Sequence, residues 1–129
     1  MHTGSCVCKA ITFEVASKLG PVEACHCKQC RQWTGHFLAS TEVPRAALTI
    51  HGAEDLTWFH SSKKVRRGFC RKCGASLFFD PTDKNKHDWI GISMGAFDSP
   101  SNTKLALHIF AAEKGDYYEI SDGLPQNEY

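Results

Sequence analysis

Cys6-Val7-Cys8 and Cys70-Arg71-Lys72-Cys73-Gly74 each contain a pair of cysteines at a spacing typical of metal ligands. Residues i and i+2 of a strand point to the same face of a sheet, so the first pair can aim both sulfurs at one ion. The second pair resembles a zinc knuckle, in which a tight turn joins two thiolates and the glycine permits a positive φ. Together they predict one closed, tetrahedral structural site that ties the N-terminal strand to a distant hairpin, built from Cys6, Cys8, Cys70 and Cys73.

The central cluster, Cys25-His26-Cys27-Lys28-Gln29-Cys30, has three cysteines that can wrap a second ion locally. Zinc prefers four ligands, so the fourth is expected to be water, a substrate thiol or a histidine. His26 is a poor choice if the segment is extended, because its side chain then points to the opposite face. The histidines that stay open as the fourth ligand are His36, His60 and His108.

The charge of the central cluster favours sulfur chemistry over hydrolysis. Three thiolates on a zinc dication leave a negative centre, which activates water poorly but deprotonates a thiol that enters the free position. Such a thiolate is ready to attack an electrophilic carbon. Lys28 and Arg31 are candidate contacts for a substrate carboxylate, with solvated surface charge as the alternative. Arg66 and Arg67, which precede the third cluster, are expected to lie on a solvated strand edge.

Length and composition predict one domain spanning residues 1–129. The composition, 42% hydrophobic and 22% charged, is typical of a globular protein, and a net charge of +1 does not indicate nucleic acid or an anionic membrane as partner. No apolar run reaches the length of a membrane span, and the N-terminus lacks an apolar signal-peptide core. We therefore expect a cytoplasmic protein with reduced cysteines, and their odd number, seven, also disfavours a disulfide framework.

Alternation of apolar and polar residues predicts a mainly β domain of short strands. In the segment 10–15, Ile11, Phe13 and Val15 point one way. Short helices are predicted at 28–33 and 44–48. Further strands are predicted at 56–60, 68–70, 76–79, 89–94, 108–110 and 117–120. The aromatic residues expected to pack in the core rather than line a pocket are Trp33, Phe37, Trp58, Phe59 and Trp89.

The order and spacing of the cysteine motifs resemble those of one family. The segments that carry this resemblance are Gly4-Ser5-Cys6-Val7-Cys8, the central cluster followed by Arg31, and Gly68-Phe69-Cys70-Arg71-Lys72-Cys73-Gly74. The segments 93–98, 108–110, 117–120 and 122–125 are similar to its C-terminal motifs. The chain thus resembles the glutathione-dependent formaldehyde-activating enzyme family, also called the centromere-protein-V/Gfa domain. One departure is Lys9, where family members often have glycine, which raises a question of turn geometry.

The resemblance implies an all-β fold of the Mss4-like, β-tent kind with two zinc ions per chain. One would be structural, on Cys6, Cys8, Cys70 and Cys73, and the other near the substrate, on Cys25, Cys27 and Cys30. It also implies a carbon–sulfur lyase, similar to S-hydroxymethylglutathione synthase, with a small thiol such as glutathione and a small aldehyde such as formaldehyde as substrates. The alternatives are a non-catalytic zinc-binding interaction module and a thiol or zinc redox sensor. The oligomeric state stays open.

Overall fold

Ten strands and one α-helix make up the protein, which is described over residues 1–129 by a computed structural model. The strands form a three-stranded sheet in the order β1-β2-β5 and a seven-stranded sheet in the order β10-β3-β4-β9-β8-β7-β6. Paired strands are antiparallel except β10 and β3, which are parallel. The bounds are β1 His2–Ser5, β2 Thr12–Val15, β3 Val22–Cys25, α1 Lys28–Thr34, β4 Leu38–Pro44, β5 Leu48–His51, β6 Leu56–His60, β7 Val65–Cys70, β8 Ser76–Pro81, β9 Trp89–Ser93 and β10 Leu105–Ile109.

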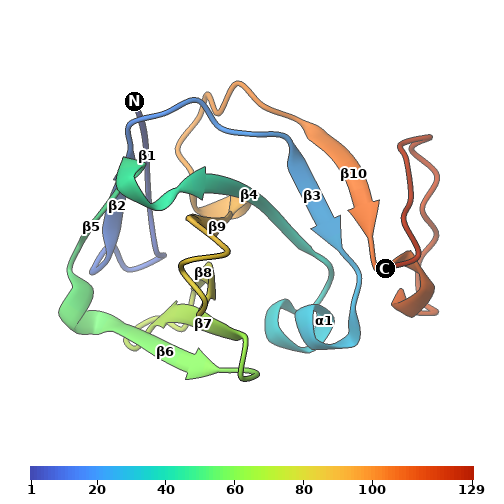
Figure 1. The fold of residues 1–129 in the computed structure, drawn as a ribbon, viewed down its shortest axis with the longest axis horizontal. Helices are drawn as coiled ribbons and strands as arrows, with labels where there is room; N and C mark the ends of the chain where they lie inside the picture. The colour runs from blue at the N-terminus through green and yellow to red at the C-terminus, as the bar shows by residue number, and fades with distance from the viewer.

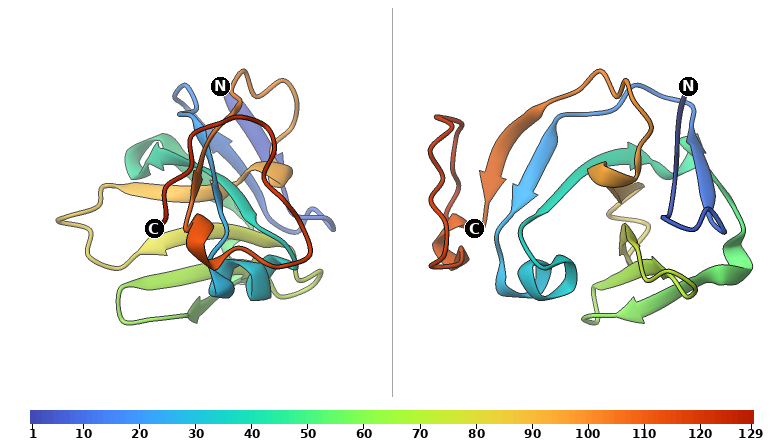
Figure 2. Two further views of the ribbon diagram at one scale, coloured as in Figure 1. Left: turned by 90° about the vertical axis from the view of Figure 1, so that its right-hand side faces the viewer. Right: turned by 180° about the vertical axis from the view of Figure 1, so that it is seen from behind.

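The seven-stranded sheet bends into an arch, with β10, β3 and β4 along one side and β7 and β6 along the other (Figure 1). The helix α1 lies at the open end of this arch, and the three-stranded sheet lies at the opposite end (Figure 2). These open sheets confirm the predicted all-β fold class. None of the helices is long and apolar enough to cross a membrane.

The core lies between the two sheets, and the alternation of apolar and polar residues in β2 turns one face of that strand toward it. Phe13 and Val15 are almost fully buried, as is Ile11 just before the strand, so the predicted apolar face is confirmed. The Phe13 ring packs edge-on against Phe78 and Phe97, with ring centroids 5.7 and 5.3 Å apart. Burying one such side chain contributes about 1.5–3 kcal/mol, so this contact is a main link between the sheets.

The seven-stranded sheet has two faces of different character. In β4, Val43 is buried in the core, whereas Glu42 points to the opposite face. The strand register carries this second face across four neighbouring strands. Its cross-strand row consists of Glu42, Gly91, Phe79 and Arg67.

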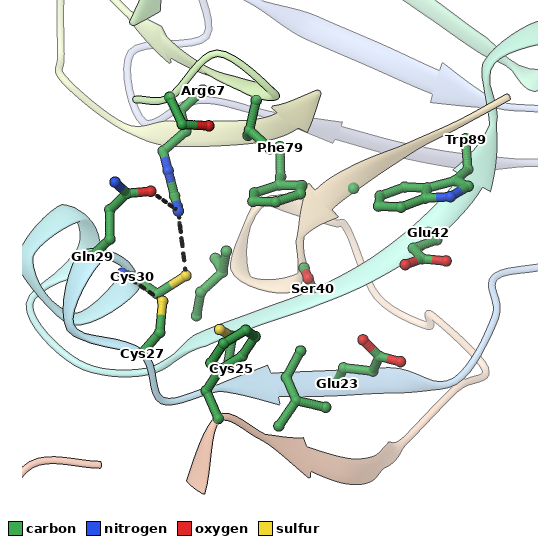
Figure 3. A pocket seen from close by; sticks show the side chains of 16 residues that line it. Glu23, Cys25, Cys27, Gln29, Cys30, Ser40, Glu42, Arg67, Phe79 and Trp89 are labelled. Atoms are coloured by element: carbon green, nitrogen blue, oxygen red, sulfur yellow. Dashed lines mark hydrogen bonds between the residues drawn. The ribbon is translucent and has the colours of Figure 1, made fainter. Parts of the chain in front are cut away.

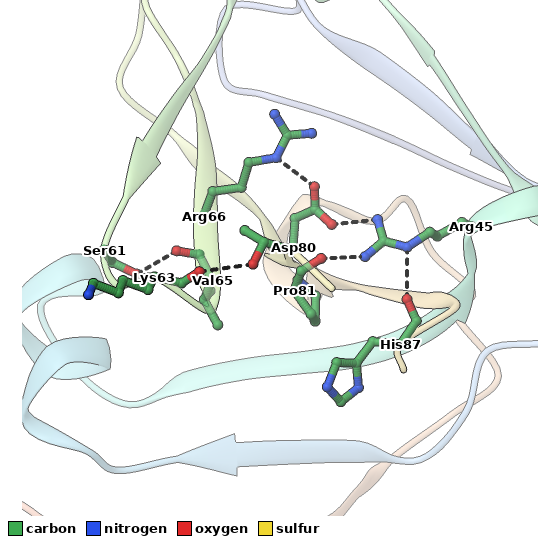
Figure 4. A network of polar contacts seen from close by, with 9 residues as sticks. Arg45, Ser61, Lys63, Val65, Arg66, Asp80, Pro81 and His87 are labelled. Carbon is green, nitrogen blue, oxygen red and sulfur yellow. Dashed lines mark hydrogen bonds and ion pairs between the residues drawn. The ribbon is translucent and has the colours of Figure 1, made fainter. Parts of the chain in front are cut away.

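A buried carboxylate fastens the end of β8. Asp80, only 1% exposed, accepts hydrogen bonds from Arg45 and from Arg66, the latter with Nε 2.7 Å from Oδ2 (Figure 4). Arg45 also donates to the carbonyls of Pro81 and His87, at 2.7 and 3.1 Å. The Arg66 guanidinium lies 3.8 Å from the ring centre of Trp58. Asp80 therefore joins β8 to the segment after β4 and to β7.

We expect Asp80→Asn to lower the free energy of unfolding by about 3 kcal/mol, because removing one partner leaves two cationic side chains without their buried counter-charge. The arginines keep some contact with water, so the loss falls at the low end of the range for buried pairs. Urea denaturation of the metal-loaded protein measures it. The same change at exposed Asp116, which makes no hydrogen bond, is the control and should cost under about 0.5 kcal/mol. Equal stability of the two variants would contradict the role of Asp80.

Four local predictions need correction. Phe59, expected to pack in the core, is 52% exposed, because it lies near the end of the edge strand β6. Residues 117–120 form no strand, because no neighbouring strand pairs with them. Cys6 and Cys8 lie in the turn between β1 and β2, so strand geometry is not what brings their sulfurs together. The helix at 28–33 is confirmed as α1, whereas 44–48 contains only a single 3-10 turn at Arg45–Ala47.

Candidate metal centres

Four cysteines from two turns meet at one point, as their spacing predicts. All four sulfurs of Cys6, Cys8, Cys70 and Cys73 lie within 4.8 Å of one another. The Sγ of Cys8 is 3.7 Å from that of Cys6 and 3.7 Å from that of Cys70. A tetrahedral ion with zinc–sulfur bonds of about 2.3 Å places its sulfurs about 3.8 Å apart. The donor set and its spacing therefore fit one tetrahedral metal ion.

The two turns present backbone N–H groups to these sulfurs. The amide of Ile11 donates to Cys6 Sγ at 3.3 Å, and the amide of Lys72 donates to Cys70 Sγ at 3.4 Å. Gly74 has φ 77° as predicted, which closes the turn after the second pair. Lys9 also has a positive φ, 64°, and so occupies the conformation that glycine adopts without strain. The turn geometry questioned at Lys9 is therefore one that glycine would adopt at lower cost.

The second cluster lies where β3 runs into α1. Cys25 ends the strand, Cys27 caps the helix and Cys30 lies in its first turn, with all three sulfurs within 4.8 Å. The amide of Cys30 donates to Cys27 Sγ at 3.3 Å. No histidine joins this group, so none of the three candidate histidines is placed as a fourth ligand.

The way the three thiols of the second cluster share protons favours the binding of a cation. Hydrogen bonds from the Cys25 thiol and then the Cys30 thiol lower the pKa of Cys27 to about 2. The same sharing of a proton, together with burial, raises the pKa of Cys25 far above its ordinary value. One thiolate is therefore favoured and further ones are opposed. A bound dication supplies the charge that lets all three sulfurs act as thiolate ligands.

His26 points away from the sulfurs, as expected from an extended segment. It is 1% exposed, and burial lowers its pKa. Its Nδ1 lies 2.6 Å from the Tyr118 hydroxyl and its Nε2 lies 2.8 Å from His108 Nδ1. His108 Nε2 in turn lies 2.8 Å from Asp122 Oδ2. Because the carboxylate of Asp122 can only accept, each hydrogen bond of this relay is donated toward Asp122. The relay thereby ties the C-terminal segment to the loop that carries the second cluster.

Arg67 is the buried cation of this region, so its predicted place on a solvated edge is wrong. It is 3% exposed, and both terminal nitrogens lie 3.6 Å from Cys30 Sγ. Alternation in β7 places Arg67 on the face opposite to Arg66, a signal that was present in the sequence. The basic pair therefore serves two different faces of the sheet.

A cavity of about 370 Å³ opens beside the second cluster (Figure 3). The three sulfurs and the Arg67 guanidinium lie toward one side of it, and two glutamates lie toward the other (Figure 3). Apolar side chains, among them Phe79 and Trp89, form much of the wall, so Trp89 lines a pocket rather than only the core. The cavity thus combines the donor cluster with a largely apolar wall and a few polar groups, which is typical of a small-molecule site.

The remaining charges are distributed unevenly around the cavity. Glu23 and Glu42 line it, and burial followed by the repulsion of Glu23 raises the pKa of Glu42. Lys28 and Arg31 do not line it. Arg31 instead donates to two backbone carbonyls, that of Glu113 at 2.9 Å and that of His26 at 3.3 Å. The cation beside the sulfurs is Arg67.

Comparison with known proteins agrees with this arrangement. The model of a family described as glutathione-dependent formaldehyde-activating enzyme matches residues 1–113. A Schizosaccharomyces pombe protein named an uncharacterized lyase is 26% identical over 122 residues, covering 94% of this chain and 86% of that protein. The crystal structure of a Rhodobacter sphaeroides protein has a TM-score of 0.58 at 20% identity, covering 96% of this chain and 98% of that one. The last likeness shows the fold alone.

Proposed function

The chain belongs to the glutathione-dependent formaldehyde-activating enzyme family, and we propose that it is a carbon–sulfur lyase acting on adducts of a glutathione-like thiol with formaldehyde. One observation carries the proposal: the three sulfurs of the second cluster line a cavity of about 370 Å³. A metal cluster that only stabilises the fold needs no such cavity. The Schizosaccharomyces pombe relative, which is named a lyase, supports the same reaction class.

We assign zinc to both clusters, because donor sets made only of thiolates favour this ion. Cys6, Cys8, Cys70 and Cys73 would hold the structural zinc, and Cys25, Cys27 and Cys30 would hold the second. When bound at the second cluster, zinc lowers the pKa of a thiol that joins it and so supplies the substrate sulfur as a thiolate.

The walls of the cavity suit the addition reaction. The sulfur loses its proton and attacks the carbonyl carbon, a C–S bond forms, and the π electron pair moves to the oxygen. The oxygen takes up one proton, so an O–H bond replaces the S–H bond. The reverse reaction breaks the same bond, so thiol and aldehyde are recovered without net gain or loss of protons. Phe79, Trp89 and Ile109 line the proposed reaction space, and their apolar side chains would favour the exclusion of water from it when substrate binds. Exclusion of water strengthens every electrostatic contact inside.

Exchange NMR tests the proposed function. A mixture of glutathione, ¹³C-formaldehyde and their adduct is expected to interconvert faster with the zinc-loaded protein than without it. The equilibrium proportion of the adduct should stay unchanged at catalytic protein concentration, which separates catalysis from simple binding of the adduct. Because thiols add to formaldehyde unaided, the rate without protein is subtracted in every measurement. Failure to accelerate exchange with several thiols and aldehydes would refute the proposal.

A further inference from the structure

Arg67 lines the cavity, and hydrogen bonds from its guanidinium to neighbouring side chains fix its position. Its Nη2 donates to Gln29 Oε1 at 2.8 Å, and its Nε donates to Ser61 Oγ at 3.3 Å. Both terminal nitrogens contact Cys30 Sγ, and the Phe79 ring centre lies 5.2 Å from the guanidinium carbon. Figure 3 shows this side chain reaching from the sheet to the helix that carries Cys30. The guanidinium is therefore positioned before any substrate arrives.

One donor of this guanidinium is unused. An arginine carries five N–H groups, one on Nε and two on each terminal nitrogen. Ser61 takes the one on Nε, Gln29 and Cys30 take both on Nη2, and Cys30 takes one on Nη1. The second N–H of Nη1 has no partner in the protein. Arg67 is 3% exposed and is one of the residues that line the cavity, so a ligand bound there could accept this donor.

The charge of Arg67 also lacks a carboxylate partner. None of the ion pairs of the protein includes this residue, whereas Arg66 beside it pairs with Asp80. A buried cation without a counter-charge is costly unless another anion meets it. The sulfur cluster supplies part of that negative charge. A substrate atom that becomes negative during the reaction would supply the rest.

We propose that Arg67 is a catalytic residue that donates its free Nη1 N–H to the aldehyde oxygen. This inference rests on the proposed function. As the C–S bond forms, the carbonyl oxygen gains the π electron pair and with it negative charge, which the guanidinium stabilises through a charge-assisted hydrogen bond. In the reverse reaction the same contact holds the adduct hydroxyl oxygen while the C–S bond breaks. Arg67 thereby acts on the oxygen and the cysteine cluster acts on the sulfur.

Two substitutions test this role by rate. Arg67→Met removes charge and donors, and Arg67→Lys keeps the charge but loses the fork that reaches several partners at once. We expect Arg67→Met to lower kcat for adduct cleavage about 100-fold, as loss of one oxyanion donor does, with little change in KM. Arg67→Lys should recover only part of that loss. Arg66→Lys is the matched control, because it makes the same substitution on the other face of the sheet. Its kcat should equal that of the unaltered protein.

A binding measurement gives a readout that does not depend on turnover. S-(2-hydroxyethyl)glutathione is a stable probe that carries a hydroxyl near the sulfur, and S-ethylglutathione lacks it. By calorimetry the unaltered protein should prefer the hydroxyl-bearing probe about tenfold, and Arg67→Met should lose that preference. A zinc assay must find two ions per chain in each variant, because a purely structural role of Arg67 would instead lower metal content or unfold the protein.

The outcomes separate the two proposals. If the unaltered protein does not accelerate exchange, the proposed function is overturned together with this inference. If it does, and Arg67→Met keeps both the rate and the preference for the hydroxyl-bearing probe, only the role of Arg67 is overturned. If Arg67→Met loses zinc or fails to fold while Arg67→Lys keeps full kcat, the residue is a structural counter-charge and the inference also falls.

Discussion

Cys70→Ser is expected to abolish cooperative folding and to release one zinc ion per chain. Cys70 is fully buried, and its sulfur lies 3.7 Å from that of Cys8, which is 62 residues away in sequence. Structural zinc is worth an apparent 10–16 kcal/mol or so in small zinc-binding domains, against about 5–15 kcal/mol for the net stability of an ordinary domain. Loss of this site therefore removes an amount of free energy comparable with the whole margin of stability.

Thermal unfolding followed by circular dichroism, together with zinc analysis, checks this prediction. The informative control is the same substitution in the other cluster, Cys27→Ser, which should leave a cooperative transition. A Cys70→Ser protein that binds two zinc ions and melts at the unaltered temperature would rule out a structural role for the four-cysteine cluster.

Cys27→Ser is the second substitution with a large expected effect, and that effect is on activity. We expect zinc to fall from two ions to one per chain and adduct exchange to return to the rate measured without protein. The fold should persist, because serine is itself a preferred N-cap and can accept the amide of Cys30 as the cysteine sulfur does. The helix also stays fastened by Trp33, whose ring stacks on Phe59 with centroids 5.9 Å apart.

Zinc content, the thermal transition and the exchange rate are measured on the same Cys27→Ser preparation. Global unfolding would mean that the second cluster is structural too. Unchanged exchange with one zinc ion would mean that the reaction takes place elsewhere. Either result would refute the proposal that Cys25, Cys27 and Cys30 hold a zinc ion whose main role is to contact the substrate.

Both clusters could be predicted from the sequence because short cysteine spacings limit which sulfurs can share an ion. This prediction did not depend on the local structure being right, because Cys6 and Cys8 come together through a turn rather than a strand. The same held for the core, where the alternation around Phe13 was enough to identify the buried face.

The cavity could not be predicted, because it depends on strand order. Glu42 and Arg67 belong to β4 and β7, and only the register through β9 and β8 places them in one row. Two adjacent arginines predict solvent exposure, but alternation within a strand sends one of them to each face, and Arg67 is the buried one. The segment 117–120 alternates like a strand, yet the Tyr118 hydroxyl bonds to His26 and no strand partner exists.

The closure of the four-cysteine cluster has a consequence for the order of events during synthesis. Cys6 and Cys8 leave the ribosome long before Cys70, and neither pair alone offers four sulfurs to an ion. A nascent chain that ends within β6 can form the β1–β2 turn but cannot complete the cluster. A metal ion could therefore fill this site only after Cys73, in the turn between β7 and β8, has emerged, and from then on it would link that turn to the turn between β1 and β2.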